Sequence, residues 1–181
     1  MSHPNIQMLD FKFHIPLGQQ KYTYAIGSST LVSVPLMQST YCKANVVASP
    51  DTAVNTLHSL PLCLQFSRSV NDAFLPPIYN IVAHNPAEFV ALHITGPVDL
   101  GKGEYRLDND TPAQWEDAVN IIERAAVALD KNTKRPTLQL FSLAPTVLMF
   151  AAGLRFYRFW PVQLYNYAGG TYKKVLDIFP E

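Results

Sequence analysis

The segment Leu138–Gly153 reads LQLFSLAPTVLMFAAG and places a short apolar strand, a tight turn and an apolar helix within one short stretch. The pattern predicts a strand–turn–helix unit. A nearly continuous apolar strand is typical of parallel sheets, and open α/β sheets bind their ligands at the carboxyl ends of such strands. The turn at residues 142–146 is therefore the first candidate for a binding site.

Regular elements are also predicted before this unit. Phe89–Ile94 is almost entirely apolar and predicts a buried strand, and a polar loop, Asp99–Asp110, follows it. A helix should then begin with Thr111 as N-cap, because Pro suits the first helical position and Gln114 stands where a capping box needs Glu or Gln. Its apolar residues recur at spacings of four and three and predict one buried stripe, formed by Trp115, Val119, Ile122, Ala126 and Leu129.

After the unit, Pro161–Tyr165 predicts a further strand, Ala168–Thr171 a turn, and Tyr172–Phe179 an edge strand that pairs back. With right-handed crossovers, the order β-α-β-α-β-β predicts an α/β fold. We expect a Rossmann-like, mostly parallel central sheet flanked by helices, with a C-terminal β-hairpin, over residues 81–181.

Residues 1–80 predict a β-rich N-terminal half of the same single domain, 1–181. Three short strands are expected there, at Phe11–Ile15, Tyr22–Ile26 and Leu31–Leu36. Asp51–Leu60 predicts a short helix before an apolar run. Asn71–Pro77 contains two adjacent prolines and is expected to be a loop or a junction.

The composition narrows the function classes. The 181 residues carry no net charge and only 15% are charged, which does not favour duplex DNA or RNA as a partner but leaves a short anionic ligand open. Two cysteines suggest no disulfide framework, and no apolar run approaches the length of a membrane span. We expect a soluble, cytoplasmic protein that does not bind membranes.

No pattern points to catalysis or to a bound cofactor. The five histidines show no metal-ligand spacing, Ser142 lacks the glycines of a nucleophile elbow, and neither GxGxxG nor a P-loop is present. We therefore expect a non-enzymatic protein with no cofactor, no catalytic residues and no metal site.

The turn Ser142-Leu143-Ala144-Pro145-Thr146 has two interpretations. Pro145 fits the first helical turn and Ala144 provides no side-chain cap, so the first helix amides would be free to bind a phosphate, with the Ser142 and Thr146 hydroxyls adding donors. Alternatively, Ser142 itself caps the helix and the turn only connects two elements. Composition alone favours neither.

Two other turns are expected to lie beside this one. Thr95-Gly96-Pro97 ends the preceding strand, and Gln38-Ser39-Thr40 ends the Leu31 strand. Basic and aromatic residues at 155–160 and 165–167, Arg155 among them, would stack bases or hold phosphates, although an aromatic-rich helix end packed into the core is the more ordinary explanation.

The chain resembles the end of a SAVED domain. The likeness covers residues 84–178 and rests on the order and spacing of short motifs, namely Asn85–Glu88, the strand Leu92–Thr95, the Trp115 helix with Glu123-Arg124-Ala125, Arg135–Leu138, the segment LQLFSLAP (138–145), Ala152-Gly153, Pro161–Tyr165 and the closing Tyr172 strand.

This resemblance implies a CARF-related sensor of cyclic oligonucleotides in bacterial antiphage defence, either CBASS or type III CRISPR. Its expected ligand is a cyclic di-, tri- or tetranucleotide. SAVED domains are usually fused to an effector, and ligand binding often drives oligomerisation. Because all 181 residues are used by the sensor-like fold, the resemblance implies a separate effector of nuclease, protease or TIR type, or a ligand-induced homo-oligomer.

The residues expected at the ligand are Ser142, Leu143, Ala144, Pro145 and Thr146, with Thr95, Gly96 and Pro97 beside them. Lys102 and Arg106 are the cations expected to reach it from the polar loop. Gln38, Ser39, Thr40 and Arg155 complete the predicted set.

Two other functions fit the sequence. One is a ligand-independent scaffold for an effector protein, marked by an exposed apolar patch around Phe156, Tyr157, Phe159 and Trp160. The other is a ring nuclease that cleaves its messenger with the help of Ser142 and Lys102.

Overall fold

The computed structural model describes residues 22–26, 29–49, 58–69, 74–82, 89–130, 136–156 and 160–179. Its three helices are α1 (Leu75–Val82), α2 (Pro112–Asp130) and α3 (Thr146–Phe156). Its strands are β1 (Tyr22–Ile26), β2 (Ser29–Gln38), β3 (Lys43–Ala48), β4 (Ser59–Gln65), β5 (Val90–Thr95), β6 (Val98–Asp99), β7 (Glu104–Tyr105), β8 (Thr137–Leu143), β9 (Val162–Ala168) and β10 (Thr171–Ile178).

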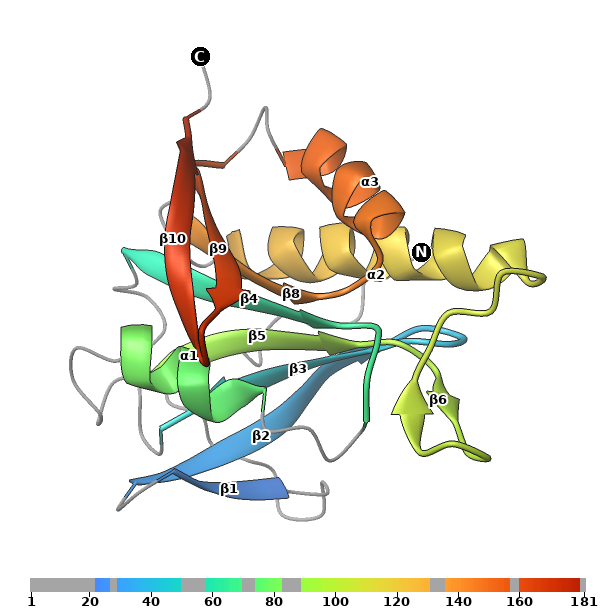
Figure 1. Ribbon diagram of the computed structural model, residues 1–181, viewed down its shortest axis with the longest axis horizontal. Coiled ribbons are helices and arrows are strands. Elements are labelled where there is room, and N and C mark those ends of the chain that lie inside the picture. The colour runs from blue at the N-terminus through green and yellow to red at the C-terminus, as the bar shows by residue number, and fades with distance from the viewer. Residues whose placement is uncertain are drawn as a thin grey trace, which may run out of the picture.

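One mixed sheet of eight strands organises the chain, in the order β1-β2-β3-β5-β4-β8-β9-β10 (Figure 1). The four strands β5, β4, β8 and β9 are parallel, and antiparallel strands extend the sheet on both sides. The fold class is therefore α/β, as the sequence predicts. Strand order reverses between β4 and β8, because the chain runs from β4 to β5 on one side and then crosses back to β8 on the other.

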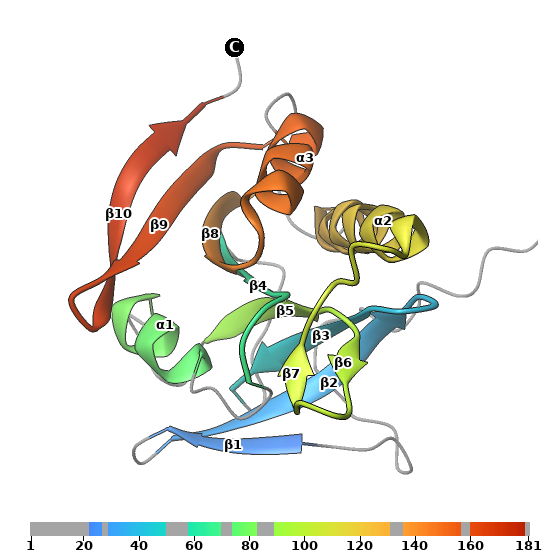
Figure 2. The same cartoon turned by 45° about the vertical axis from the view of Figure 1, so that its right-hand side comes forward.

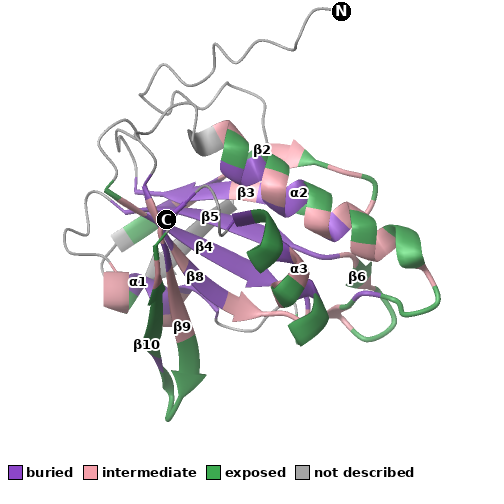
Figure 3. Ribbon diagram, turned by 90° about the horizontal axis from the view of Figure 1, so that it is seen from above, coloured by how far each residue is buried: buried purple, intermediate pink, exposed green. Residues whose placement is uncertain are grey.

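The helices cover both faces of the parallel strands. Helices α2 and α3 pack on one face, over the larger core around Leu62, Leu92 and Ile122, whereas α1 packs on the other face, over Cys63 and Phe141 (Figure 2). The central strands are buried on both sides, and the outer part of the β9–β10 hairpin is exposed (Figure 3). Apolar residues on both faces of β4 and β5 account for this, since strands covered twice do not alternate in polarity.

The predicted order of elements from residue 89 onward is confirmed. Strand β5, helix α2, strand β8, helix α3 and strands β9 and β10 follow in that order, and β10 lies at the edge of the sheet. The start of α2 at Pro112 is also as predicted. The side chain of Gln114, however, accepts a hydrogen bond from the Asp108 amide (2.7 Å) rather than from Thr111, so it anchors the preceding loop.

Several other predictions need correction. Pro76 and Pro77 do not form a loop, as predicted, but lie in the first turn of helix α1, where a missing amide hydrogen costs no hydrogen bond. Residues Ser59 and Leu60 belong to a strand and not to the predicted helix, whose residues 51–57 lie outside the described part. The predicted Phe11–Ile15 strand also lies outside it. Strand β3 was not predicted.

The buried face of α2 is broader than the predicted stripe. Ile122 and Ala126 are buried, but Ala118, Ile121 and Ala125 join them, and Trp115 and Val119 are only partly covered. The side chain of Leu129 lies outside the described part. Trp115 and Val119 instead line a groove together with residues of α3.

Candidate functional site

The carboxyl ends of β5, β4 and β8 lie in one row. Thr95 pairs with Gln65, and Gln65 pairs with Leu143, so the two outer strand ends are about 10 Å apart. We predicted that the turns after Thr95 and Leu143 would be neighbours, but β4 lies between them. This edge is also where strand order reverses, which is the position at which open α/β sheets place ligands.

The segment after β4, which the prediction missed, lies at the centre of this edge. The Phe66 amide donates to the Leu143 carbonyl (2.8 Å), the Ser67 hydroxyl donates to the same oxygen (3.1 Å), and the Gln65 carbonyl accepts from the Gly96 amide (3.1 Å). Arg68 then adopts a φ of 74°, and no other non-glycine residue in the described ranges has a positive φ. Such strain concentrates at functional sites. The sequence signal that could have predicted this segment is the apolar run that ends in Gln65-Phe-Ser-Arg-Ser69.

Helix α3 begins at this edge without a side-chain cap. Its first residue is Thr146 and not Pro145. Pro145 occupies the N-cap position, because its carbonyl accepts a hydrogen bond from the Met149 amide (3.2 Å). Ser142 is not a cap, because its hydroxyl contacts the Met149 sulfur (2.8 Å). Within the described part of the chain, the amides of residues 146–148 have no hydrogen-bond acceptor.

Gly96 and its neighbours have a packing role in this row. The Gly96 amide is bonded to β4, the Pro97 carbonyl accepts the Arg106 amide (3.0 Å), and Thr95 is buried. A Cβ atom on Gly96 would lie only 2.8 Å from Cδ1 of Phe66. The turn Thr95-Gly96-Pro97 therefore shapes the edge and offers few free donors of its own.

Lys102 and Arg106 lie on an exposed extension of the same edge. Strands β6 and β7 pair as a short hairpin, which contains part of the predicted polar loop and stands at the carboxyl ends of the strands (Figure 1). The Tyr105 amide donates to the Arg68 carbonyl (2.9 Å), and Ser69 forms an isolated β-bridge with Glu104. Backbone contacts therefore attach the hairpin to the segment after β4. Both cations are exposed there.

The third predicted turn lies on this edge but at a distance. Gln38 pairs with Lys43, which pairs with Thr95, so Gln38 stands about 19 Å from Leu143 along the row. Gln38 is also two strands, about 10 Å, from Thr95, so the structure does not bring Gln38, Ser39 and Thr40 to the Ser142–Thr146 turn.

Asp117 of α2 gives Ser39 of this third turn a structural role. Its carboxylate accepts the Ser39 hydroxyl (2.5 Å) and the Tyr41 amide (2.9 Å). Burial raises the pKa of Asp117, but the hydrogen bonds from the turn outweigh it and hold the pKa below its ordinary value. Burial, and then the charge of Asp117, raise the pKa of the nearby Cys42 thiol to about 12. Ser39 thus ties a turn to a helix.

Arg155 lies at the opposite end of α3, about 14 Å along the helix from its start at Thr146. Its guanidinium forms an ion pair with Glu123 of α2 (3.3 Å). A groove of about 430 Å³ runs between the two helices and is lined by Trp115, Glu116, Val119, Asn120, Val147, Leu148, Ala151 and Arg155. Arg155 therefore belongs to this groove and not to the strand-end turn.

The apolar patch predicted around residues 156–160 is wrong where the structure describes it. Phe156 and Trp160 are buried and pack against each other with ring centroids 5.6 Å apart. Tyr157 and Phe159 lie outside the described residues. Exposed apolar side chains occur instead on the outer face of α3.

A buried polar pair underlies the edge on the α1 face. The His93 Nε2 atom lies 3.0 Å from Oε1 of Gln65, and Phe74 packs against the imidazole ring. Burial lowers the pKa of His93 to about 4, so the ring is neutral near pH 7. We interpret this pair as a fixed support for the end of β4.

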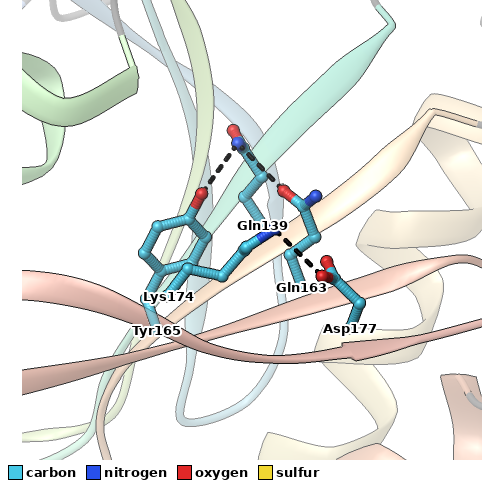
Figure 4. Close-up of polar contacts among 5 residues, drawn as sticks. All are labelled: Gln139, Gln163, Tyr165, Lys174 and Asp177. Atoms are coloured by element: carbon cyan, nitrogen blue, oxygen red, sulfur yellow. Dashed lines mark hydrogen bonds and ion pairs between the residues drawn. The ribbon is translucent and has the colours of Figure 1, made fainter.

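A second polar cluster lies further back on the same face, across β8, β9 and β10 (Figure 4). The Gln139 amide donates to Gln163 and to the Tyr165 hydroxyl (3.3 Å each), and Lys174 is paired with Asp177 (2.9 Å). Gln139 lies four residues before the end of β8, about 13 Å from the edge. The cluster therefore stabilises strand pairing and does not belong to the edge site.

Comparison of the sequence with models of known protein families finds no match, and comparison with curated proteins finds none either. None of the helices in the described ranges has both the length and the apolar character needed to cross a membrane. In those ranges, His, Cys, Asp and Glu side chains also form no group of three suited to a metal ion.

Proposed function

We propose that this chain is a non-enzymatic sensor that binds a cyclic oligonucleotide second messenger at the carboxyl edge above β4 and β8. In this proposal the fold is CARF-like, and the bound state activates a separate effector in antiphage defence. The observation that carries the proposal is the start of α3, where three amides without acceptors lie at the point of strand-order reversal.

Phosphate chemistry fits this place. Amides at a helix N-terminus point outward and share the positive end of the helix dipole, which favours a bound anion. Arg68, Lys102 and Arg106 are exposed on neighbouring segments of the same edge. A compact cyclic ligand with two to four phosphates needs only such a local set of donors, so a chain with no net charge can bind it.

The resemblance of residues 84–178 to a SAVED domain supports the choice of ligand class. The segments that carry the likeness include β5, β8 and the start of α3, which form this edge. The distribution of buried and exposed residues agrees with a sensor role as well, because the strand ends are fixed by packing while the cations stand on exposed loops.

Titration calorimetry with cyclic di-, tri- and tetranucleotides tests the proposal. At least one ring should bind, and the matching linear oligonucleotide should bind more weakly. A folded sample that binds no ring in the panel would refute the sensor function.

The variant Thr146→Asp makes the test specific to the site. An acidic residue in the first turn stabilises the helix itself, so the fold is expected to persist while the added charge repels a phosphate. Thr146→Asn, which has similar size without the charge, is the control. We expect the aspartate to weaken binding at least about tenfold and the asparagine to change it little.

A further inference from the structure

The outer face of α3 carries an apolar stripe. Val147, Phe150 and Leu154 are 70%, 70% and 58% exposed, and their spacing of three and four places them on one side of the helix. Single exposed apolar residues are common, but together these form a patch of roughly 400 Å², a size that often marks an interaction site. The α2–α3 groove borders this stripe and shares Val147 with it.

Gly153 lies beside the stripe, and no packing contact with the described residues accounts for it. It is exposed within a helix, where glycine is less favourable than alanine, and a Cβ added to it would meet no atom within 4 Å. Nothing in the part of the chain that the structure describes therefore requires a residue without a side chain here. A molecule that packs closely against α3 from outside would require it.

We propose that this molecule is a second copy of the chain, whose α3 packs antiparallel on the first across a two-fold axis. Phe150 and Gly153 are one turn apart, and a two-fold axis between them places each Phe150 ring over the Gly153 of the other copy. One large side chain and one vacant position on the same face thus form a self-complementary pair.

The charges beside the stripe agree with a like partner. Arg155 is already paired with Glu123 of its own chain at 3.3 Å, so this cation needs no counter-charge from the partner. Two patches of this size bury on the order of 800 Å², below the range of stable complexes. The dimer is therefore weak and reversible, and it forms without nucleotide.

Sedimentation equilibrium of the full chain without nucleotide, from about 10 µM to about 1 mM, tests the proposal. The average mass should rise from one chain toward two. Phe150→Glu should weaken dimerisation at least about tenfold, whereas Val127→Glu, at a 38% exposed apolar position on α2 outside the stripe, should leave it unchanged. A monomer at every concentration, or a dimer that Phe150→Glu does not weaken, would overturn it.

Gly153→Gln separates assembly from folding. Because a Cβ at this position meets no atom of the described residues within 4 Å, and glutamine favours a helix more than glycine does, the melting temperature should stay the same or rise while the dimer weakens. A dimer that tolerates this substitution would contradict the predicted close approach.

Mixed disulfide formation tests the pairing itself. Cys42 and Cys63 are buried and their thiol pKa values are raised, so an introduced surface cysteine is the reactive one. Under mild oxidation, a mixture of Phe150→Cys and Gly153→Cys chains should give a higher yield of disulfide-linked dimer than either variant gives by itself. A mixed yield no higher than the separate yields would refute the register.

Discussion

Replacing Gly96 with alanine should destabilise the protein through a single contact. The new Cβ would lie 2.8 Å from Cδ1 of Phe66, closer than real Cβ contacts, which essentially never fall under 3.0 Å. Gly96 is not among the described glycines with positive φ, so its backbone accommodates alanine. The cost must therefore come from Phe66, which is fully buried in the larger core and has little room to move.

The size of the effect follows from the cost of adding a methyl group to a packed core, about 1–3 kcal/mol. For a chain of this size, a loss of about 2 kcal/mol lowers the melting temperature by about 4–8 °C. Phe66→Leu should remove about half of this cost, because the smaller side chain leaves part of the space that the new methyl group needs.

A double-mutant cycle measured by urea unfolding gives the result. We expect Gly96→Ala to lose about 2 kcal/mol in the wild-type background and about 1 kcal/mol less with Leu at position 66. An equal loss in both backgrounds, or no loss in either, would refute the close contact between the strand ends of β4 and β5.

Three further predictions concern the turn, the strained residue and the fate of the ligand. Asp117→Asn should cost about 1–2 kcal/mol near pH 7, because Asp117 accepts the Ser39 hydroxyl and the Tyr41 amide. Since the pKa of Asp117 is lowered in the folded state, the stability that wild type has over Asp117→Asn should be complete above about pH 4 and vanish as the pH falls through the folded pKa. Urea unfolding of both proteins across this pH range measures the difference in stability. A difference that does not change with pH would contradict the prediction. Arg68→Gly should weaken nucleotide binding in calorimetry while stability changes by no more than about 1 kcal/mol, because glycine adopts a positive φ without strain but loses more backbone entropy on folding. Unchanged affinity would exclude Arg68 from the site. Chromatography after long incubation should recover the cyclic ligand intact, and a linear product would instead support the ring nuclease.

The elements that could be predicted are those with local signals. Thr111-Pro112 marks the start of α2, and the 138–153 segment contains strand, turn and helix in contiguous residues, so each needs only its own neighbourhood. The order of strands could not be predicted this way. Strand β4 is inserted between β5 and β8 by pairings far apart in the chain, and with it come Gln65 and Arg68, the missed centre of the edge.

Side-chain roles depended on the same distant contacts. Ser39 was predicted at the ligand because it follows a strand, but Asp117, 78 residues away, uses its hydroxyl. Arg155 was predicted there because it is basic and close in sequence, but α3 carries it to the far end of the groove. The exposed stripe on α3 was not predicted, because an apolar helix is expected to lie in the core and its sequence does not show which side the rest of the protein leaves uncovered.

Hydrogen exchange at the amides of Thr146, Val147 and Leu148, with and without a bound cyclic oligonucleotide, tests the central claim most directly. These amides have no acceptor within the described chain, so a phosphate bound at the start of α3 should slow their exchange. Slower exchange there, lost in Thr146→Asp, is the predicted result. Binding that leaves these three amides unchanged and protects a different surface would contradict it.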